Sequence, residues 1–117
     1  ICRPPPWFHP SRCGCGRADM DKSFMAMMQL LRDRYQKPLP ISSGYRCPDY
    51  NDRVSKTGQN GPHTTGRAGD IPIDRREARL LLTLAVDIIP RIGVNQKGDN
   101  RFYHFDTLDT GPTIWSY

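Results

Sequence analysis

Two histidines and one aspartate are the residues of this chain best suited to hold a metal ion. His63 lies in a loop that leads into a predicted strand, and Asp70 lies within that strand between small and apolar neighbours. A charged acid in such a place is costly unless a metal or a basic group pairs with it. His104 lies in a second predicted strand. Together the three side chains form a two-histidine, one-carboxylate set, which leaves one zinc position open for water, as in catalytic zinc sites.

A carboxylate lies two residues beyond His104. Strand alternation places Phe102, His104 and Asp106 on one face, with His104 and Asp106 about 7 Å apart along the strand. Zinc polarises a carbonyl group and lowers the pKa of bound water to about 7. Hydrolysis also needs a general base beside that water. We therefore predict that Asp106 is the general base.

Arg46 is the remaining candidate for chemistry, and it follows Ser42-Ser43-Gly44-Tyr45 at the end of a predicted strand. A guanidinium can bind a substrate carboxylate or stabilise the oxyanion of a tetrahedral intermediate. It can equally be a surface arginine paired with Asp49 or Asp52. The local sequence leaves both interpretations open.

Periodicity predicts two main helices. One begins at Asp19 or Asp21 and ends near Tyr35, with a buried apolar stripe. The other begins with a capping-box spacing at Asp74 and Glu77 and is stopped by Pro90. A brief helix is expected from Pro48 to Val54. The stripe of the first helix comprises Met20, Phe24, Met27, Met28 and Leu31.

Short strands are predicted between and after these helices. The segment from Pro38 to Arg46 reads as strand then turn, residues 55–66 as a loop, and Arg67 to Ile73 as a strand. Residues 91–95 and 101–107 read as two strands joined by a polar turn. Helices mixed with short strands, without regular βαβ alternation, predict an α+β domain at residues 20–117. Residues 1–19 read as an irregular arm rich in cysteine and proline.

Composition excludes two classes of function. The net charge is +5, but the basic residues are scattered, so we expect no nucleic-acid binding. No run of about 18 apolar residues is present, so we expect no membrane span. The four cysteines, Cys2, Cys13, Cys15 and Cys47, fit disulfides, free thiols or a second, structural zinc, and their pairing stays open.

The order of the motifs resembles the M15 family of zinc D-Ala-D-Ala carboxypeptidases and murein endopeptidases, whose core is shared with the zinc-bearing domain of hedgehog proteins. The resemblance covers roughly residues 20–117. It rests on Ser43-Gly44-Tyr45-Arg46-Cys47-Pro48 with Asn51, on His63-x-x-Gly66-x-Ala68-x-Asp70-Ile71, on Phe102-x-His104-x-Asp106-Thr107, and on Trp115.

The resemblance implies one zinc ion held by His63, Asp70 and His104, and substrate binding by Ser43 and Arg46. It also implies a small antiparallel sheet backed by helices, with the zinc in a cleft on the sheet. The implied substrates are peptidoglycan peptides that contain D-amino acids. Accordingly, we expect a monomer that acts in the periplasm, after secretion, or as a phage-encoded enzyme on the cell wall. A zinc-stabilised binding module without activity is the alternative.

Two positions depart from the family pattern. Gly61 stands where many relatives have a serine, two residues before the first zinc histidine. Arg101 stands three residues before the last histidine, where several members carry their catalytic acid. Arginine cannot act as a base at neutral pH. The base is therefore expected at Asp106, with Asp99 as second candidate if the preceding turn folds over the metal.

Overall fold

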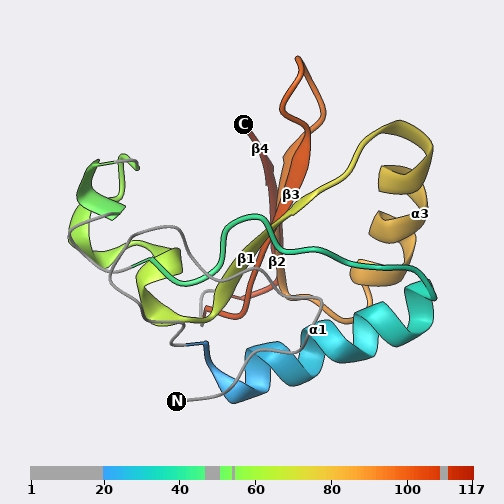
Figure 1. The fold of residues 1–117 in the computed structure, drawn as a ribbon, viewed down its shortest axis with the longest axis horizontal. Coiled ribbons are helices and arrows are strands. Elements are labelled where there is room, and N and C mark those ends of the chain that lie inside the picture. Colours follow the sequence, from blue (N-terminus) through green and yellow to red (C-terminus); the bar gives the residue numbers. More distant parts are fainter. Residues whose placement is uncertain (1–19, 47–50, 54, 109–110) are drawn as a thin grey trace.

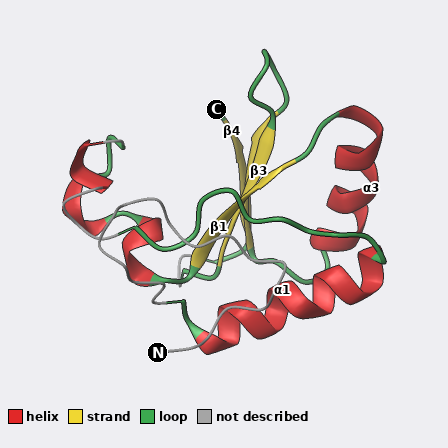
Figure 2. Ribbon diagram, in the orientation of Figure 1, coloured by secondary structure: helices red, strands yellow, loops and turns green. Residues whose placement is uncertain are grey.

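A four-stranded sheet with two helices packed against one face forms the domain (Figures 1 and 2). The computed structural model describes residues 20–46, 51–53, 55–108 and 111–117. The expected α+β class is confirmed. The elements in chain order are α1 (Lys22–Tyr35), η1 (Gly58–Asn60), η2 (Pro62–Thr65), β1 (Ala68–Pro72), α3 (Arg75–Ala85), β2 (Arg91–Asn95), β3 (Phe102–Asp106) and β4 (Thr113–Ser116).

The sheet has the strand order β1-β3-β2-β4. β3 pairs antiparallel with both β1 and β2, as expected for the two strands joined by the turn at residues 96–100. The expected small antiparallel sheet is thus found in β1, β3 and β2, whereas β4 pairs parallel with β2 and makes the whole sheet mixed. β4 was not predicted as a strand, because only Ile114 and Trp115 of its four residues are apolar and such a short segment shows little alternation.

The first helix follows the sequence prediction closely. Asp21 is its N-cap, and the Asp21 carboxylate accepts a hydrogen bond from the Phe24 backbone N–H at 2.9 Å. Four members of the predicted stripe are buried, and Met27 is partly buried against them. The helix packs on the sheet face that carries Ile71, Tyr103 and Phe105. This leaves the opposite face of β3, with His104 and Asp106, for the site.

The second helix, α3, begins at the predicted place, but its N-terminal capping and its C-terminal end differ from the prediction. Asp74 is its N-cap residue, yet the Asp74 side chain makes no capping hydrogen bond, so the predicted capping box does not form. The helix ends at Ala85, before the predicted stop at Pro90. Its buried residues, Ala78 and Leu81 among them, join the same core as α1. Both helices therefore support the sheet from one side.

Three segments between α1 and β1 differ from their predictions or are only partly described. Residues 38–46 form no full strand: Ser43 makes a single antiparallel bridge to Asp70 of β1. Residues 55–66, predicted as a loop, contain the two 3-10 turns η1 and η2. Residues 51–53 are helical, whereas the rest of the predicted Pro48–Val54 helix lies outside the described residues.

The predicted N-terminal arm and all four cysteines also lie outside the described residues. Within the part of the chain that the structure describes, no helix is long and apolar enough to cross a bilayer.

Candidate metal centre

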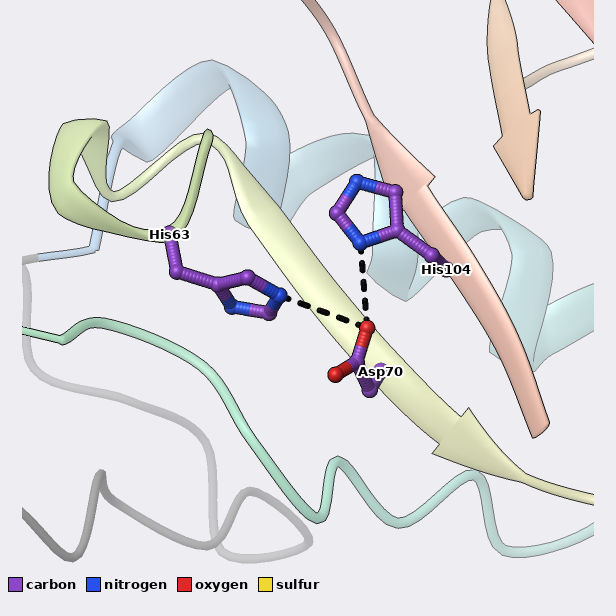
Figure 3. A group of neighbouring side chains, drawn as sticks. All are labelled: His63, Asp70 and His104. Atoms are coloured by element: carbon purple, nitrogen blue, oxygen red, sulfur yellow. Dashed lines mark hydrogen bonds and ion pairs between the residues drawn. The ribbon is translucent and has the colours of Figure 1, made fainter. Parts of the chain in front are cut away.

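His63, Asp70 and His104 lie together on the open face of the sheet (Figure 3). Asp70 Oδ1 lies 3.3 Å from His63 Nε2 and 3.0 Å from His104 Nδ1. The three atoms all lie within 4.8 Å of one another. Oxygen and nitrogen ligands about 2.0–2.1 Å from a tetrahedral zinc ion are roughly 3.3 Å apart, so the two measured separations suit a shared ion.

Strand register brings Asp70 and His104 into contact. The two residues are directly opposite in the β1–β3 pairing. The Asp70 N–H and C=O are both used on the other edge of β1, where they bond to Ser43 O and Ser42 N. Asp70 and His104 therefore form a non-hydrogen-bonded pair, the kind in which facing side chains approach most closely.

His63 reaches the same point from η2. The Asp21 N–H donates to Gly66 O at 2.8 Å, which ties the end of this turn to the start of α1. Gly66 has a φ of 73°, a left-handed conformation that glycine adopts without strain. Four residues therefore connect His63 to the start of β1.

The second nitrogen of each imidazole determines which nitrogen is free for a metal. His63 Nδ1 lies 2.8 Å from the Gly44 carbonyl oxygen, which only accepts, so Nδ1 carries the proton. His104 Nε2 lies 2.8 Å from Asp106 Oδ2 and donates to it. In the neutral rings the lone pairs are therefore on His63 Nε2 and His104 Nδ1, the two atoms that face Asp70. Such outer hydrogen bonds are typical of metal-binding histidines.

Electrostatics agree with this set. Burial raises the pKa of Asp70, but hydrogen bonds to His104 and His63 outweigh burial and hold the pKa far below its usual range. Burial lowers the pKa of His104, but Asp106 and Asp70 outweigh it and the net shift is upward. The carboxylates of Asp70 and Asp106 on either side of the His104 ring thus favour a positive charge at this point. A divalent ion would supply such a charge.

Arg46 lies beside the metal-binding group. Arg46 Nη2 is 3.6 Å from Asp70 Oδ2, and Nε donates to Ser43 Oγ at 3.1 Å. Arg46 Nη1 donates at 3.2 Å to Oδ1 of Asn51, which is fully buried. The Arg46 side chain is 17% exposed, and its guanidinium is held by three different partners. Of the two sequence interpretations, the described residues favour a positioned arginine over a loose surface pair.

Asp106 does not occupy the position expected of a general base. The residue is fully buried. Its Oδ2 accepts from His104 Nε2, on the side of the ring away from Asp70, and its Oδ1 accepts from Arg91 Nε at 2.6 Å and from Leu108 N at 3.1 Å. Burial raises the pKa of Asp106, but bonds to His104, the Leu108 N–H and Arg91 lower it overall. The placement therefore does not fit the expected role, because both oxygens hold the histidine and its surroundings rather than face a water.

The second candidate base is also away from the metal-binding group. Asp99 is exposed in the turn between β2 and β3 and is not among the described residues that line the cavity. Asp70 is the one carboxylate among the described lining residues.

A cavity of about 520 Å³ lies over the three metal-binding side chains. One wall is aromatic: Phe102 and Tyr117 rings are 5.3 Å apart, and Trp115 lies 5.6 Å from the His104 ring. Gly93 makes this wall possible, since a Cβ there would lie 2.8 Å from three atoms of the Trp115 ring. Three cations line the cavity as well: Arg46, Lys56 and Arg91.

The sequence matches the family description Peptidase M15 over residues 9–106. The chain belongs to the Peptidase M15 family. Neither the curated proteins nor the solved structures yield a match. The family and the histidine–aspartate–histidine group together identify a metallopeptidase, and the resemblance seen in the motifs is confirmed. The match begins within the predicted N-terminal arm, at residue 9.

Some residues around the site of this M15 peptidase were not predicted. Arg91 was missed. Alternation along residues 91–95 places Arg91 and Gly93 on one face, but it does not reveal that they pair with Asp106 and His104 of β3, because that depends on how the two strands are aligned. Gly61, noted as a departure, is also explained. A Cβ at Gly61 would overlap Thr57 Oγ1 and would lie 2.9 Å from Asn51 Nδ2, so this packing leaves no room for a serine.

Proposed function

We propose that this M15 peptidase uses one zinc ion to hydrolyse peptide bonds in peptidoglycan peptides that contain D-amino acids. The observation that carries the proposal is the arrangement of three ligand atoms on the floor of an open cavity. Both histidine lone pairs and one carboxylate oxygen point to one place, and each histidine is oriented from behind. Two histidines, one carboxylate and an open side are the composition of a catalytic rather than a structural zinc site.

In this proposal His63 Nε2, Asp70 Oδ1 and His104 Nδ1 hold the zinc. When bound, zinc supplies Lewis acidity, which polarises the scissile carbonyl and lowers the pKa of a water. Gly44 and Asp106 keep the two imidazoles in the ligating tautomer. Neither Asp106 nor Asp99 is placed to take the proton from that water.

Arg46 is proposed to bind a substrate carboxylate or to stabilise the oxyanion that forms at the carbonyl. Ser43 and Asn51 hold the guanidinium beside the metal-binding group, so little reorganisation is needed when the substrate arrives. Ser43, expected to bind substrate, is not among the described residues that line the cavity, and in this proposal its Oγ acts by holding Arg46 Nε. The aromatic wall of Phe102, Trp115 and Tyr117 would cover the substrate backbone and exclude water.

The second candidate is a zinc-stabilised binding module without activity. One observation favours it: among the described residues lining the cavity, no carboxylate besides Asp70 is present to act as a base. Against it stands Arg46, since a module without chemistry has no need of a cation held by three partners next to the metal.

Zymography on purified peptidoglycan, with and without a chelator, tests the function. We expect clearing that disappears on chelation and returns with added zinc, and no clearing by a His104→Ala variant. Mass spectrometry of the digested muropeptides would then identify the bond. Stoichiometric zinc without any clearing or released peptide would contradict the enzyme and support the binding module.

The proposed substrate also implies where the protein acts. It would act where peptidoglycan is accessible, either periplasmic or secreted, or as a phage-encoded enzyme on the cell wall. We propose that it does so as a monomer, which light scattering of the zinc-loaded protein would test.

A further inference from the structure

We propose that Lys56 binds a second carboxylate of the substrate, so that this peptidase prefers acidic peptides over their amidated forms. The inference rests on the proposed function and adds a substrate class to it. Arg46 and Lys56 would receive two different anionic groups of one peptide.

Lys56 lines the same cavity as the metal-binding group but comes from another part of the chain. It lies between the short helical stretch at residues 51–53 and η1, and its side chain is exposed. In Figure 1 this green segment stands on the side of the sheet away from α3. Lys56 therefore belongs to the rim of the cavity rather than to its floor.

The backbone on both sides of Lys56 is anchored. The Ser55 N–H donates to Asn51 O at 2.9 Å, and Thr57 Oγ1 accepts from Asn51 Nδ2 at 2.8 Å. The Ser55 and Thr57 hydroxyls also bond to each other at 2.9 Å. Asn51 is fully buried, and its Oδ1 holds Arg46. One buried residue therefore contacts both the Arg46 guanidinium and the turn that carries Lys56.

Lys56 differs from the other two cations of the cavity in having no partner among the residues that the structure describes. Arg46 lies 3.6 Å from Asp70 Oδ2, and Arg91 is paired with Asp106. Among the residues that the structure describes, none forms a hydrogen bond or ion pair with the Lys56 ammonium group. A zinc ion would add two positive charges to a cavity whose described lining has Asp70 as its one carboxylate. Such a surface attracts anions, and within the described part of the chain the charge of Lys56 at its rim is unpaired.

Two matched pentapeptides test the proposal. Both have the stem sequence L-Ala-γ-D-Glu-L-Lys-D-Ala-D-Ala, and they differ only in whether the D-Glu α-carboxyl group is free or amidated. Besides the C-terminus, this is the one free carboxylate of the stem. We expect the wild-type enzyme to have a KM about three- to fivefold lower for the acid form, as for one partly exposed charge pair.

Lys56→Gln should abolish this preference by raising KM for the acid peptide alone, with kcat unchanged. Lys56→Arg should retain the preference. Lys97→Gln is the control for net charge, since Lys97 is exposed in the β2–β3 turn and is not among the described lining residues. The wild-type preference should also shrink as salt is raised. An equal KM change for both peptides in Lys56→Gln, or a preference that survives it, would overturn the proposal.

Calorimetry separates this proposal from the proposed function. If wild-type protein loaded with zinc cleaves neither peptide, the enzymatic proposal fails, but binding of the two pentapeptides can still be compared. Tighter binding of the acid form that is lost in Lys56→Gln would support the role of Lys56. Equal binding of both forms by the wild-type protein, or no binding of either, would refute it.

Discussion

Replacing Asp106 by asparagine is expected to weaken metal binding, although Asp106 is not a ligand. The side chain is fully buried and keeps the same shape in this substitution. One oxygen accepts from His104 Nε2, and the other accepts from both Arg91 Nε and Leu108 N. An amide has one oxygen and one NH₂ group, so it can serve only one of these two sides.

Each orientation of the introduced amide has a definite cost. If the NH₂ group faces Arg91 and Leu108, two donors meet a third, and loss of a hydrogen bond to a charged group costs about 1.5–3 kcal/mol of stability. If the NH₂ group faces His104, Nε2 must accept, and the proton moves to Nδ1. That atom is the one facing Asp70, so the histidine no longer offers a lone pair to the metal.

Loss of an outer partner of a metal-binding histidine typically lowers metal affinity about 10- to 100-fold. We expect a loss in that range for Asp106→Asn, measured by competition with a chromophoric chelator, together with a lower unfolding midpoint of the metal-free protein. Asp99→Asn is the control, because Asp99 is an exposed carboxylate of the β2–β3 turn. Wild-type affinity and wild-type stability in Asp106→Asn would refute the reasoning, and full affinity with lost turnover would restore Asp106 as a candidate base.

Three further predictions concern the support of the site. Gly93→Ala should destabilise the fold by about 1–3 kcal/mol, because its Cβ displaces the Trp115 ring; chemical denaturation should show the loss, and it should shrink in a Trp115→Ala background. Removing zinc that is present at about 100 times its Kd should lower the free energy of unfolding by about 2.7 kcal/mol and the melting temperature by roughly 10 °C. The melting temperature of His63→Ala should not respond to zinc. Asp21→Ala should cost about 1 kcal/mol by loss of the α1 cap, whereas Asp33→Ala, on the exposed face, should cost much less in the same melts.

The three residues that could hold a metal were predictable because they lie in strong local patterns. Alternation in β3 separates His104 and Asp106 from Tyr103 and Phe105, and the packing of the aromatic pair in the hydrophobic core with the helices confirms this. Asp70 stood out because a charged group between Gly69 and Ile71 requires a partner. These inferences use only the period of a strand and the cost of burying charge.

The role of Asp106 was not predictable in the same way. Alternation gives the face on which Asp106 lies, but not which nitrogen of His104 points toward Asp70. That choice follows from the β1–β3 register and from Arg91, a residue of β2 that is opposite Asp106. The parallel pairing of β4 escaped prediction for a similar reason, because it depends on Trp115 fitting over Gly93 rather than on any pattern within the tail.

The part of the site that lies on the sheet is one row of residues, which His63 joins from η2. Asp70, His104, Gly93 and Trp115 are successive partners from β1 to β4. A slip of one residue in any pairing would turn a member of this row to the helix-covered face. The core residues on that face, such as Phe105, therefore do more than stabilise the domain: by fixing which residues of β3 face the helices, they fix which residues face the metal. Metal affinity is thus expected to be a sensitive measure of sheet register in this protein, because Asp70 and His104 meet only when β1 and β3 are aligned.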